Sequence, residues 1–336
     1  MKTMNERRIF LKQLAMLTGG LMIPVNSFAS TNRDKWGELL PLRTLGKTNK
    51  KVTMLGLGGF HIGWTTEREA QKVIEKAMEG GVRFFDTAES YDNGGSEIRY
   101  GKYLVPKYRD DVFIMSKSTA SNGTTARKHL EGTLRRMKCD YIDLWQVHSL
   151  RTPEDVDNRI ENEVLEVFEK AKAEGKVKHI GFTGHQNPFA HKRMLEKTTD
   201  NDILETIQMP INTIDMHFHS FIKNVLPIAI DRNFGVLAMK TLSDGRFFKE
   251  KRMQDKTQWE SKDPIIPNYI SVKEALDFVW SLPISVLITG AEKVEFIEEK
   301  INLAKNFIKY SENDRYKLLD KVIVKAGNEI EYYKKV

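Results

Sequence analysis

Hydrophobic positions along the chain follow two alternating patterns from residue 52 onward. Short, nearly continuous apolar runs are typical of parallel strands, which are buried on both faces. Longer segments between them repeat their apolar residues every three or four positions, as amphipathic helices do. Residues 67–80 are one example, with their apolar side chains on one helical face: Ala70, Val73, Ile74, Ala77 and Met78. The pattern therefore predicts strands that alternate with helices.

Strand and helix pairs follow one another in strict order along the chain. The predicted strands are residues 52–60, 82–86, 111–117, 141–148, 178–183, 203–209, 235–239 and 286–288. The predicted helices are residues 67–80, 96–104, 125–137, 164–173, 188–195, 225–231, 271–280 and 294–304. Such a repeat is most economically a single closed (β/α)8 TIM barrel, an α/β fold with its helices outside. A long polar loop after the seventh strand (241–270) and a C-terminal helical tail (310–336) fall outside the repeat.

The first 29 residues have the layout of a bacterial twin-arginine export signal. Arg7 and Arg8 precede Phe-Leu-Lys, an apolar run with glycines continues to residue 25, and small residues up to residue 29 suit cleavage. A basic amphipathic first helix of the mature fold is the alternative, which two glycines and a proline in this run disfavour.

Three segments are therefore expected: a signal peptide at residues 1–29, a linker at 30–41 and the barrel at 42–336. The twin-arginine export machinery, which carries folded proteins, would be a partner, and the mature protein would work in the periplasm. The apolar run of the signal is short for a membrane span, so we expect no stable span in the mature protein, although an uncleaved anchor stays open.

Composition narrows the function classes. The chain has 336 residues, of which 40% are hydrophobic, and it can bury a sizeable core. Its formal charge is +7, but residues 1–29 contribute four basic side chains and one acidic side chain, which leaves +4 on the rest. This mild bias does not indicate nucleic-acid binding. The single cysteine, Cys139, excludes an internal disulfide and a cysteine-ligated zinc site or cluster.

Four polar residues lie at or just past the ends of the second, third and fourth predicted strands: Asp86, Tyr91, Lys117 and His148. In a parallel barrel the active site lies at the C-terminal ends of the strands, so these side chains should share one mouth. A tyrosine, with an ordinary pKa of about 10, is a poor proton donor at neutral pH. A lysine beside it would lower that pKa, a carboxylate would hold the lysine, and a histidine would orient a substrate carbonyl.

This ordered set, preceded by Gly-Val-Arg-Phe-Phe-Asp-Thr-Ala at residues 81–88, resembles the aldo-keto reductase superfamily over residues 42–305. The resemblance implies Tyr91 as the general acid/base, Lys117 and Asp86 as its tuning pair, and His148 as the residue that orients the carbonyl. It also implies direct hydride transfer between a nicotinamide cofactor and the carbonyl carbon of a small-molecule substrate, without a metal.

The resemblance further implies NADP as the cofactor, and it suggests where the nicotinamide lies. Gln208 matches a glutamine that holds the carboxamide, and Thr183 could share that role. Gly184 stands where relatives have an asparagine, which it cannot replace. Met239 stands where many relatives stack a tyrosine on the nicotinamide, and Lys240 could meet the pyrophosphate.

The adenosine end is expected at residues 288–299, where Gly290 and Lys293 would take part. Many relatives that prefer NADP carry basic residues here, whereas this chain also carries Glu292 and Glu295. Acids repel a 2′-phosphate and can bond a free 2′-hydroxyl, so NAD stays open as an alternative.

Substrate walls are expected from the loops after the first, fourth and sixth strands, with His61, Trp64, Trp145 and residues 216–218 as candidates. The main hypothesis is an exported oxidoreductase that interconverts an aldehyde or ketone and an alcohol. One alternative is a cofactor-binding redox sensor or regulatory subunit with little turnover. Another is an isomerase or aldolase in which Lys117 forms a Schiff base, which the neighbouring Asp86 and Tyr91 disfavour.

Overall fold

The computed structural model describes residues 32–243, 270–323, 327 and 330–335. Eight parallel strands close into a barrel, in which the last strand pairs with the first through Leu287 and Leu55. The strands are β5 (Leu55–Gly58), β6 (Phe84–Asp86), β7 (Phe113–Ser118), β8 (Ile142–Val147), β9 (Val177–Thr183), β10 (Thr206–Pro210), β11 (Gly235–Met239) and β12 (Val286–Gly290). This arrangement confirms the predicted (β/α)8 fold.

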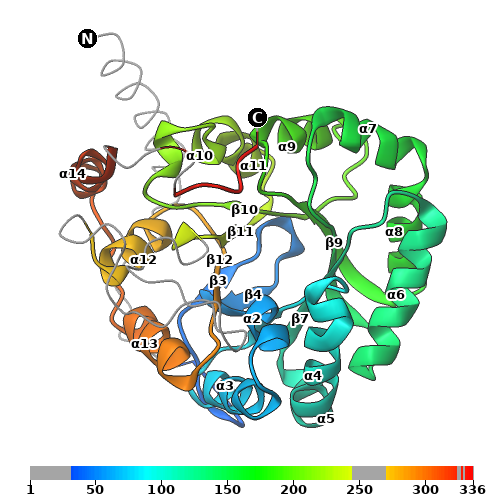
Figure 1. The fold of residues 1–336 in the computed structure, drawn as a ribbon, viewed down its shortest axis with the longest axis horizontal. Helices are drawn as coiled ribbons and strands as arrows, with labels where there is room; N and C mark the ends of the chain where they lie inside the picture. The colour runs from blue at the N-terminus through cyan, green and yellow to red at the C-terminus, as the bar shows by residue number, and fades with distance from the viewer. Residues whose placement is uncertain (1–31, 244–269, 324–326, 328–329, 336) are drawn as a thin grey trace.

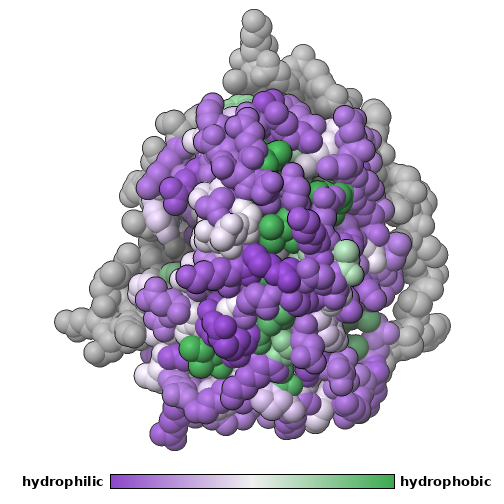
Figure 2. All heavy atoms as spheres, turned by 90° about the vertical axis from the view of Figure 1, so that its right-hand side faces the viewer, coloured by the Kyte–Doolittle hydropathy of each residue, from purple (hydrophilic) through white to green (hydrophobic). Residues whose placement is uncertain are grey.

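Helices surround the barrel (Figure 1). Those that follow the predicted rhythm are α3 (Glu67–Glu79), α4 (Gly95–Tyr103), α6 (Gly123–Met137), α8 (Val164–Ala173), α9 (Pro188–Lys197), α11 (Leu226–Asp231), α12 (Val272–Trp280) and α13 (Val294–Lys305). Short helices that the sequence reading missed are α2 (Gly59–Trp64), α5 (Val105–Tyr108), α7 (Pro153–Glu161) and α10 (Phe221–Asn224). The face seen in Figure 2 is mostly hydrophilic with small scattered apolar groups, as expected for the outer faces of amphipathic helices.

The apolar core has two parts, one inside the barrel and one between the strands and the helices. Phe84 and Phe113, on neighbouring strands, stack with ring centroids 5.1 Å apart. A hairpin of β3 (Leu42–Thr44) and β4 (Lys51–Thr53) adds Leu45 and Val52 to the inner core. The predicted strand 52–60 is therefore wrong as one unit, because its first residues belong to this hairpin and its last begin α2.

The described part of the predicted linker, residues 32–41, packs on the barrel. Strands β1 (Arg33–Asp34) and β2 (Gly37–Glu38) form a small hairpin. Asp34 accepts hydrogen bonds from Arg83 Nε at 2.6 Å and Nη2 at 2.9 Å, and Leu40 is fully buried. These contacts anchor the segment next to the start of β6.

The C-terminal tail contains the expected helix, α14 (Glu312–Val322), and residues 330–335 then return to the barrel beside α10 and α11 (Figure 1). Most of the loop expected at 241–270 lies outside the described residues. Among the helices described, none is long and apolar enough to cross a membrane.

Candidate active site

A pocket of about 350 Å³ lies at the C-terminal ends of the strands, where the sequence placed the active site. Every barrel strand, or the loop that follows it, contributes to its wall. The lining residues are Gly58, Phe60, His61, Asp86, Ser90, Tyr91, Lys117, Thr119, His148, Ser149, Thr183, His185, Gln208, Met239, Lys240, Ile288 and Gly290.

Strand register explains why Asp86 and Lys117 meet. Asp86, the last residue of β6, pairs with Met115 of β7. Lys117 follows Met115 by two positions, so its side chain points to the same face, which is the inside of the barrel. The Lys117 ammonium lies 2.5 Å from Asp86 Oδ1, and both side chains are almost completely buried. The strand ends thus create a buried ion pair.

Tyr91 completes this arrangement. It begins a 3-10 turn, η2 (Tyr91–Gly94), just after β6. Lys117 Nζ donates hydrogen bonds to the Tyr91 hydroxyl oxygen at 3.1 Å and to the Thr87 carbonyl at 2.7 Å. Because the Tyr91 oxygen accepts from Lys117, its own O–H proton stays available to a ligand in the pocket.

His148 follows β8 directly and faces Tyr91, with ring centroids 5.7 Å apart. The backbone N–H of His148 donates to the Ser118 carbonyl at 2.8 Å, and the His148 carbonyl accepts from Arg159 Nη1 at 2.8 Å. Ser90 Oγ lies 3.5 Å from its Nδ1 atom. Both backbone contacts fix the main chain at His148, which lines the pocket together with Asp86, Tyr91 and Lys117. The four residues proposed from sequence therefore share one site.

Burial is the largest single influence on the pKa values of Tyr91, Lys117 and His148. Burial raises the pKa of Tyr91 to about 12, although the Lys117 cation acts in the opposite direction. Burial thus outweighs the lowering of this pKa that the sequence predicted from the neighbouring lysine. Burial tends to lower the pKa of Lys117, but Asp86 and Tyr91 outweigh it and the pKa is raised. Burial, with the Lys117 charge, holds the pKa of His148 well below its ordinary value. At neutral pH the site thus presents a protonated phenol, an ammonium and a neutral imidazole.

The opposite wall of the pocket suits a primary amide. Gln208 and Thr183 are register neighbours on β10 and β9, and both are buried. Among the described residues the buried Gln208 Oε1 has no hydrogen-bond partner. An unpartnered buried acceptor is unfavourable, and the N–H₂ group of a nicotinamide carboxamide would satisfy it. These residues therefore fit the nicotinamide end of the expected cofactor.

At the end of β12 the backbone and a neighbouring side chain lie very close together. At Gly290 a Cβ atom would lie 1.9 Å from Nδ1 of His61, so only glycine can occupy this position beside that ring. His61 and Gly290 both line the pocket, as do Met239 and Lys240. Lys293 is not among the lining residues and lies at the N-cap of α13.

Two predicted substrate residues lie elsewhere. Trp145 is fully buried and stacks on Phe168 of α8 with centroids 3.6 Å apart, so its assignment to the pocket wall was wrong. It points outward because the preceding residue, Leu144, faces the barrel interior. Trp64 is also absent from the pocket lining. Its ring lies 5.2 Å from the ring of Phe60, and Phe60 does line the pocket. Residues 216–218 are likewise outside the lining.

Sequence reasoning missed other lining residues, notably Phe60, Ser90, Thr119, Ser149 and His185. All of them follow strand ends, which was the only signal that could have found them. Within the described ranges, no group of three or more His, Cys, Asp or Glu side chains is placed to hold a metal ion.

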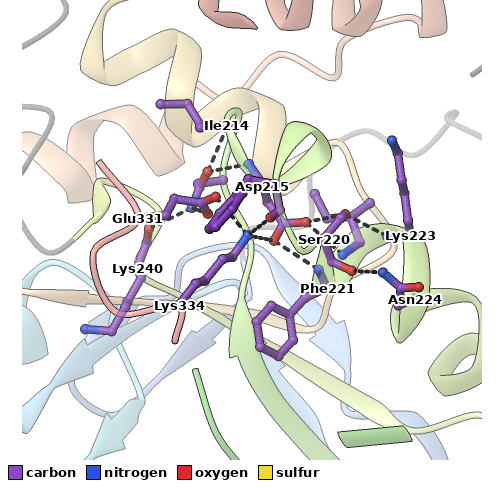
Figure 3. Close-up of polar contacts among 12 residues, drawn as sticks. Ile214, Asp215, Ser220, Phe221, Lys223, Asn224, Lys240, Glu331 and Lys334 are labelled. Carbon is purple, nitrogen blue, oxygen red and sulfur yellow. Dashed lines mark hydrogen bonds and ion pairs between the residues drawn. The ribbon is translucent and has the colours of Figure 1, made fainter. Parts of the chain in front are cut away.

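The returning C-terminal segment is anchored by a second buried lysine (Figure 3). The Lys334 ammonium, fully buried, lies 2.7 Å from Asp215 Oδ1 and 2.8 Å from Glu331 Oε2, and donates to the Phe218 carbonyl at 2.6 Å. Asp215 also accepts from the backbone N–H groups of Phe221 and Ile222. The tail is therefore tied to the loop after β10.

Tyr333 connects this anchor to the pocket. Its ring lies 5.1 Å from Lys240 Nζ and 6.0 Å from the His185 ring, and both of these residues line the pocket. Asn212 Nδ2 donates to the Tyr333 hydroxyl at 3.0 Å. The tail thus supports the wall formed by the ends of β9 and β11.

Comparison with known proteins gives consistent results. The model of the Aldo/keto reductase family matches residues 54–315. A Bacillus subtilis protein described as the uncharacterized oxidoreductase YqkF is 24% identical over 293 residues, which are 78% of this chain and 90% of that protein. The holo form of aldo-keto reductase AKR11C1 from Bacillus halodurans has a TM-score of 0.68 at 18% identity, with 84% of this chain and 96% of that chain covered. An aldo-keto reductase from Klebsiella pneumoniae in complex with NADPH has a TM-score of 0.65 at 22% identity, with 83% and 94% covered.

Replacing Lys334 with methionine should release the tail. The change leaves the Asp215 and Glu331 carboxylates buried without their cation, at a cost of about 3–5 kcal/mol. We expect faster amide hydrogen exchange at residues 212–222 and 330–335. Lys335→Met, at an exposed neighbouring position, is the matched control and should leave exchange unchanged. Unchanged exchange in the Lys334 variant would contradict the anchoring role.

Proposed function

This chain belongs to the aldo/keto reductase family, and on that basis we propose a nicotinamide-dependent oxidoreductase that interconverts an aldehyde or ketone and an alcohol. The observation that carries the proposal is the buried Lys117, which contacts both Asp86 and Tyr91 at the bottom of a pocket. The reaction is direct hydride transfer, with Tyr91 as the general acid/base.

Each of the four residues has a distinct task in this proposal. During reduction the Tyr91 hydroxyl donates its proton to the carbonyl oxygen, and the Lys117 ammonium stabilises the phenolate that results. Asp86 holds Lys117 in place and balances its charge. The neutral His148 ring donates a hydrogen bond that orients the carbonyl oxygen beside Tyr91.

NADP is the proposed cofactor, and it would supply or accept the hydride. Gln208 and Thr183 would hold the carboxamide, and Met239 would pack against the nicotinamide. The phosphate and adenosine parts of NADP would be bound by Lys240, Gly290 and Lys293. The Klebsiella pneumoniae structure, solved with NADPH, supports this choice. His61 is proposed as a wall for the substrate, together with Phe60.

We infer that the chain reaches the periplasm through the twin-arginine machinery, already folded and with its cofactor bound. The support is the arrangement of residues 1–29, which lie outside the described part of the structure. Exported protein would otherwise meet little free nicotinamide cofactor.

Tyr91→Phe should lower turnover by about 1,000-fold, because the variant has no proton to donate or accept. NADPH affinity, followed by quenching of protein fluorescence, should change little. Tyr103→Phe is the matched control, since its hydroxyl bonds to Glu67 outside the pocket and its loss should leave turnover intact. Full activity in the Tyr91 variant would exclude the proposed mechanism.

The pH dependence should differ between the two directions. With a pKa of about 12, Tyr91 stays protonated at neutral pH. We expect kcat/KM for carbonyl reduction to stay level from about pH 6 to about pH 9. Alcohol oxidation needs Tyr91 to accept a proton and should rise with pH, by up to about tenfold per pH unit. A fall in reduction centred near pH 7 would show that a different group titrates in the site.

Replacing both Arg7 and Arg8 with lysine should keep the protein in the cytoplasm of its producing cells, as twin-arginine export requires the arginine pair. Cell fractionation and immunoblotting would measure the distribution. Lys2→Arg, outside the pair, serves as the control. Periplasmic accumulation of the double variant would contradict this route.

A further inference from the structure

A second cavity lies beside the candidate active site. It is an open groove of about 430 Å³ lined by Glu89, Ser90, Asn93 and Thr119 and by residues of α6. Ser90 and Thr119 also line the pocket that holds Tyr91 and Lys117, so the two cavities adjoin each other. The groove adjoins the ends of β6 and β7. The residues proposed for the nicotinamide lie on β9 to β11, so a bound cofactor would leave the groove open.

Basic side chains outnumber acidic ones among the residues that line the groove. Lys128, Arg135 and Arg136 of α6 line it, together with His129. Arg136 is held by Glu97, with its Nε donating at 2.6 Å. Lys128 and Arg135 are exposed, and neither side chain has an ion-pair or hydrogen-bond partner among the residues that the structure describes. Two cations without such a partner that line the same groove favour an anionic ligand.

Glu89 indicates a second property that a ligand of the groove should have, which is a hydrogen-bond donor. Its side chain is only 7% exposed. Its Oε1 atom accepts from the Thr119 backbone N–H at 2.9 Å and lies 3.3 Å from His129 Nδ1. Its Oε2 atom is buried and has no partner within the described ranges. A buried carboxylate oxygen without a partner is unfavourable, and a ligand hydroxyl that donates to it would remove that cost.

We propose that this groove is a substrate subsite that selects carbonyl compounds with both hydroxyl groups and an anionic end, as in open-chain sugar acids and sugar phosphates. The carbonyl would lie at Tyr91, a hydroxyl would donate to Glu89, and the carboxylate or phosphate would lie between Lys128 and Arg135. The inference rests on the proposed function, because it places the reacting carbonyl at Tyr91.

Matched aldehydes test the anionic part. Initial rates with NADPH would be compared for D-glucose, D-glucuronate and D-glucose 6-phosphate, with 4-nitrobenzaldehyde as an uncharged reference. The variant is Lys128→Gln with Arg135→Gln. We expect kcat/KM for the two anionic sugars to fall about tenfold in this variant, less at high salt, with little change for the other two aldehydes. The larger loss with glucuronate or with the phosphate would tell which anion the groove prefers.

A control variant separates a local effect from a change in net charge. Lys170→Gln with Lys309→Gln removes the same two charges from exposed positions that do not line the groove. It should leave all four kcat/KM values within about twofold. Equal losses in the two double variants would overturn the proposal.

The hydroxyl part is tested with Glu89→Gln. D-Glucuronate is compared with 6-oxohexanoate, which has the same chain length and carboxylate without the hydroxyls. Ratios between variant and wild type cancel the small open-chain fraction of the sugar. We expect kcat/KM to fall about tenfold for glucuronate and to stay within about twofold for 6-oxohexanoate. Equal effects on both would overturn the role of Glu89.

A binding measurement keeps the proposal independent of turnover. D-Gluconate carries the hydroxyls and the carboxylate but has no aldehyde to reduce. Calorimetric titration of the protein with NADPH present should give a Kd about tenfold weaker in the Lys128 and Arg135 double variant than in wild type. Equal Kd values would overturn the subsite. Absence of turnover with every aldehyde, including 4-nitrobenzaldehyde, would instead overturn the proposed function, while the titration still decides the subsite.

Discussion

The buried cation of Lys117 is the constraint on which the mouth of this barrel depends. An ammonium removed from water is costly unless charged and polar groups surround it. Here Asp86, Thr87 and Tyr91, all at or just beyond the end of one neighbouring strand, supply three oxygen contacts. The register between β6 and β7 brings them to the lysine, so the packing of the barrel also fixes Tyr91, the proposed proton donor. Stability and chemistry therefore depend on the same contacts.

A second buried lysine organises the other side of the mouth. Lys334 ties the C-terminal segment to Asp215, and Tyr333 beside it packs against Lys240 and His185. Burial and the Asp215 charge raise the pKa of Glu331 to about 7. The pocket is thus framed by local strand register on the side of β6 and β7, and by contacts between distant segments on the side of β9 to β11.

The sequence alone predicted those features that depend on the order of the elements and on the periodicity of apolar residues. The eight strands and the four residues at strand ends follow from short apolar runs and from the polar residues that close them. The face of a residue in a fully apolar strand is not readable in this way, and Trp145 was assigned to the pocket although it packs against α8. The high pKa of Tyr91 depends on how completely the fold buries its side chain, and a sequence motif carries no information about that burial. The partners of Lys334, and the lack of a partner for the Glu89 Oε2 atom among the described residues, arise from tertiary packing and leave no local signal in the sequence.

The central claim is that Lys117 makes Tyr91 an effective proton donor. Single-turnover oxidation of bound NADPH by an aldehyde, followed by stopped-flow in wild type and in Lys117→Met, tests it most directly. We expect the hydride-transfer rate to fall by about 1,000-fold in the variant, with NADPH affinity unchanged. A rate within about threefold of wild type would contradict the claim.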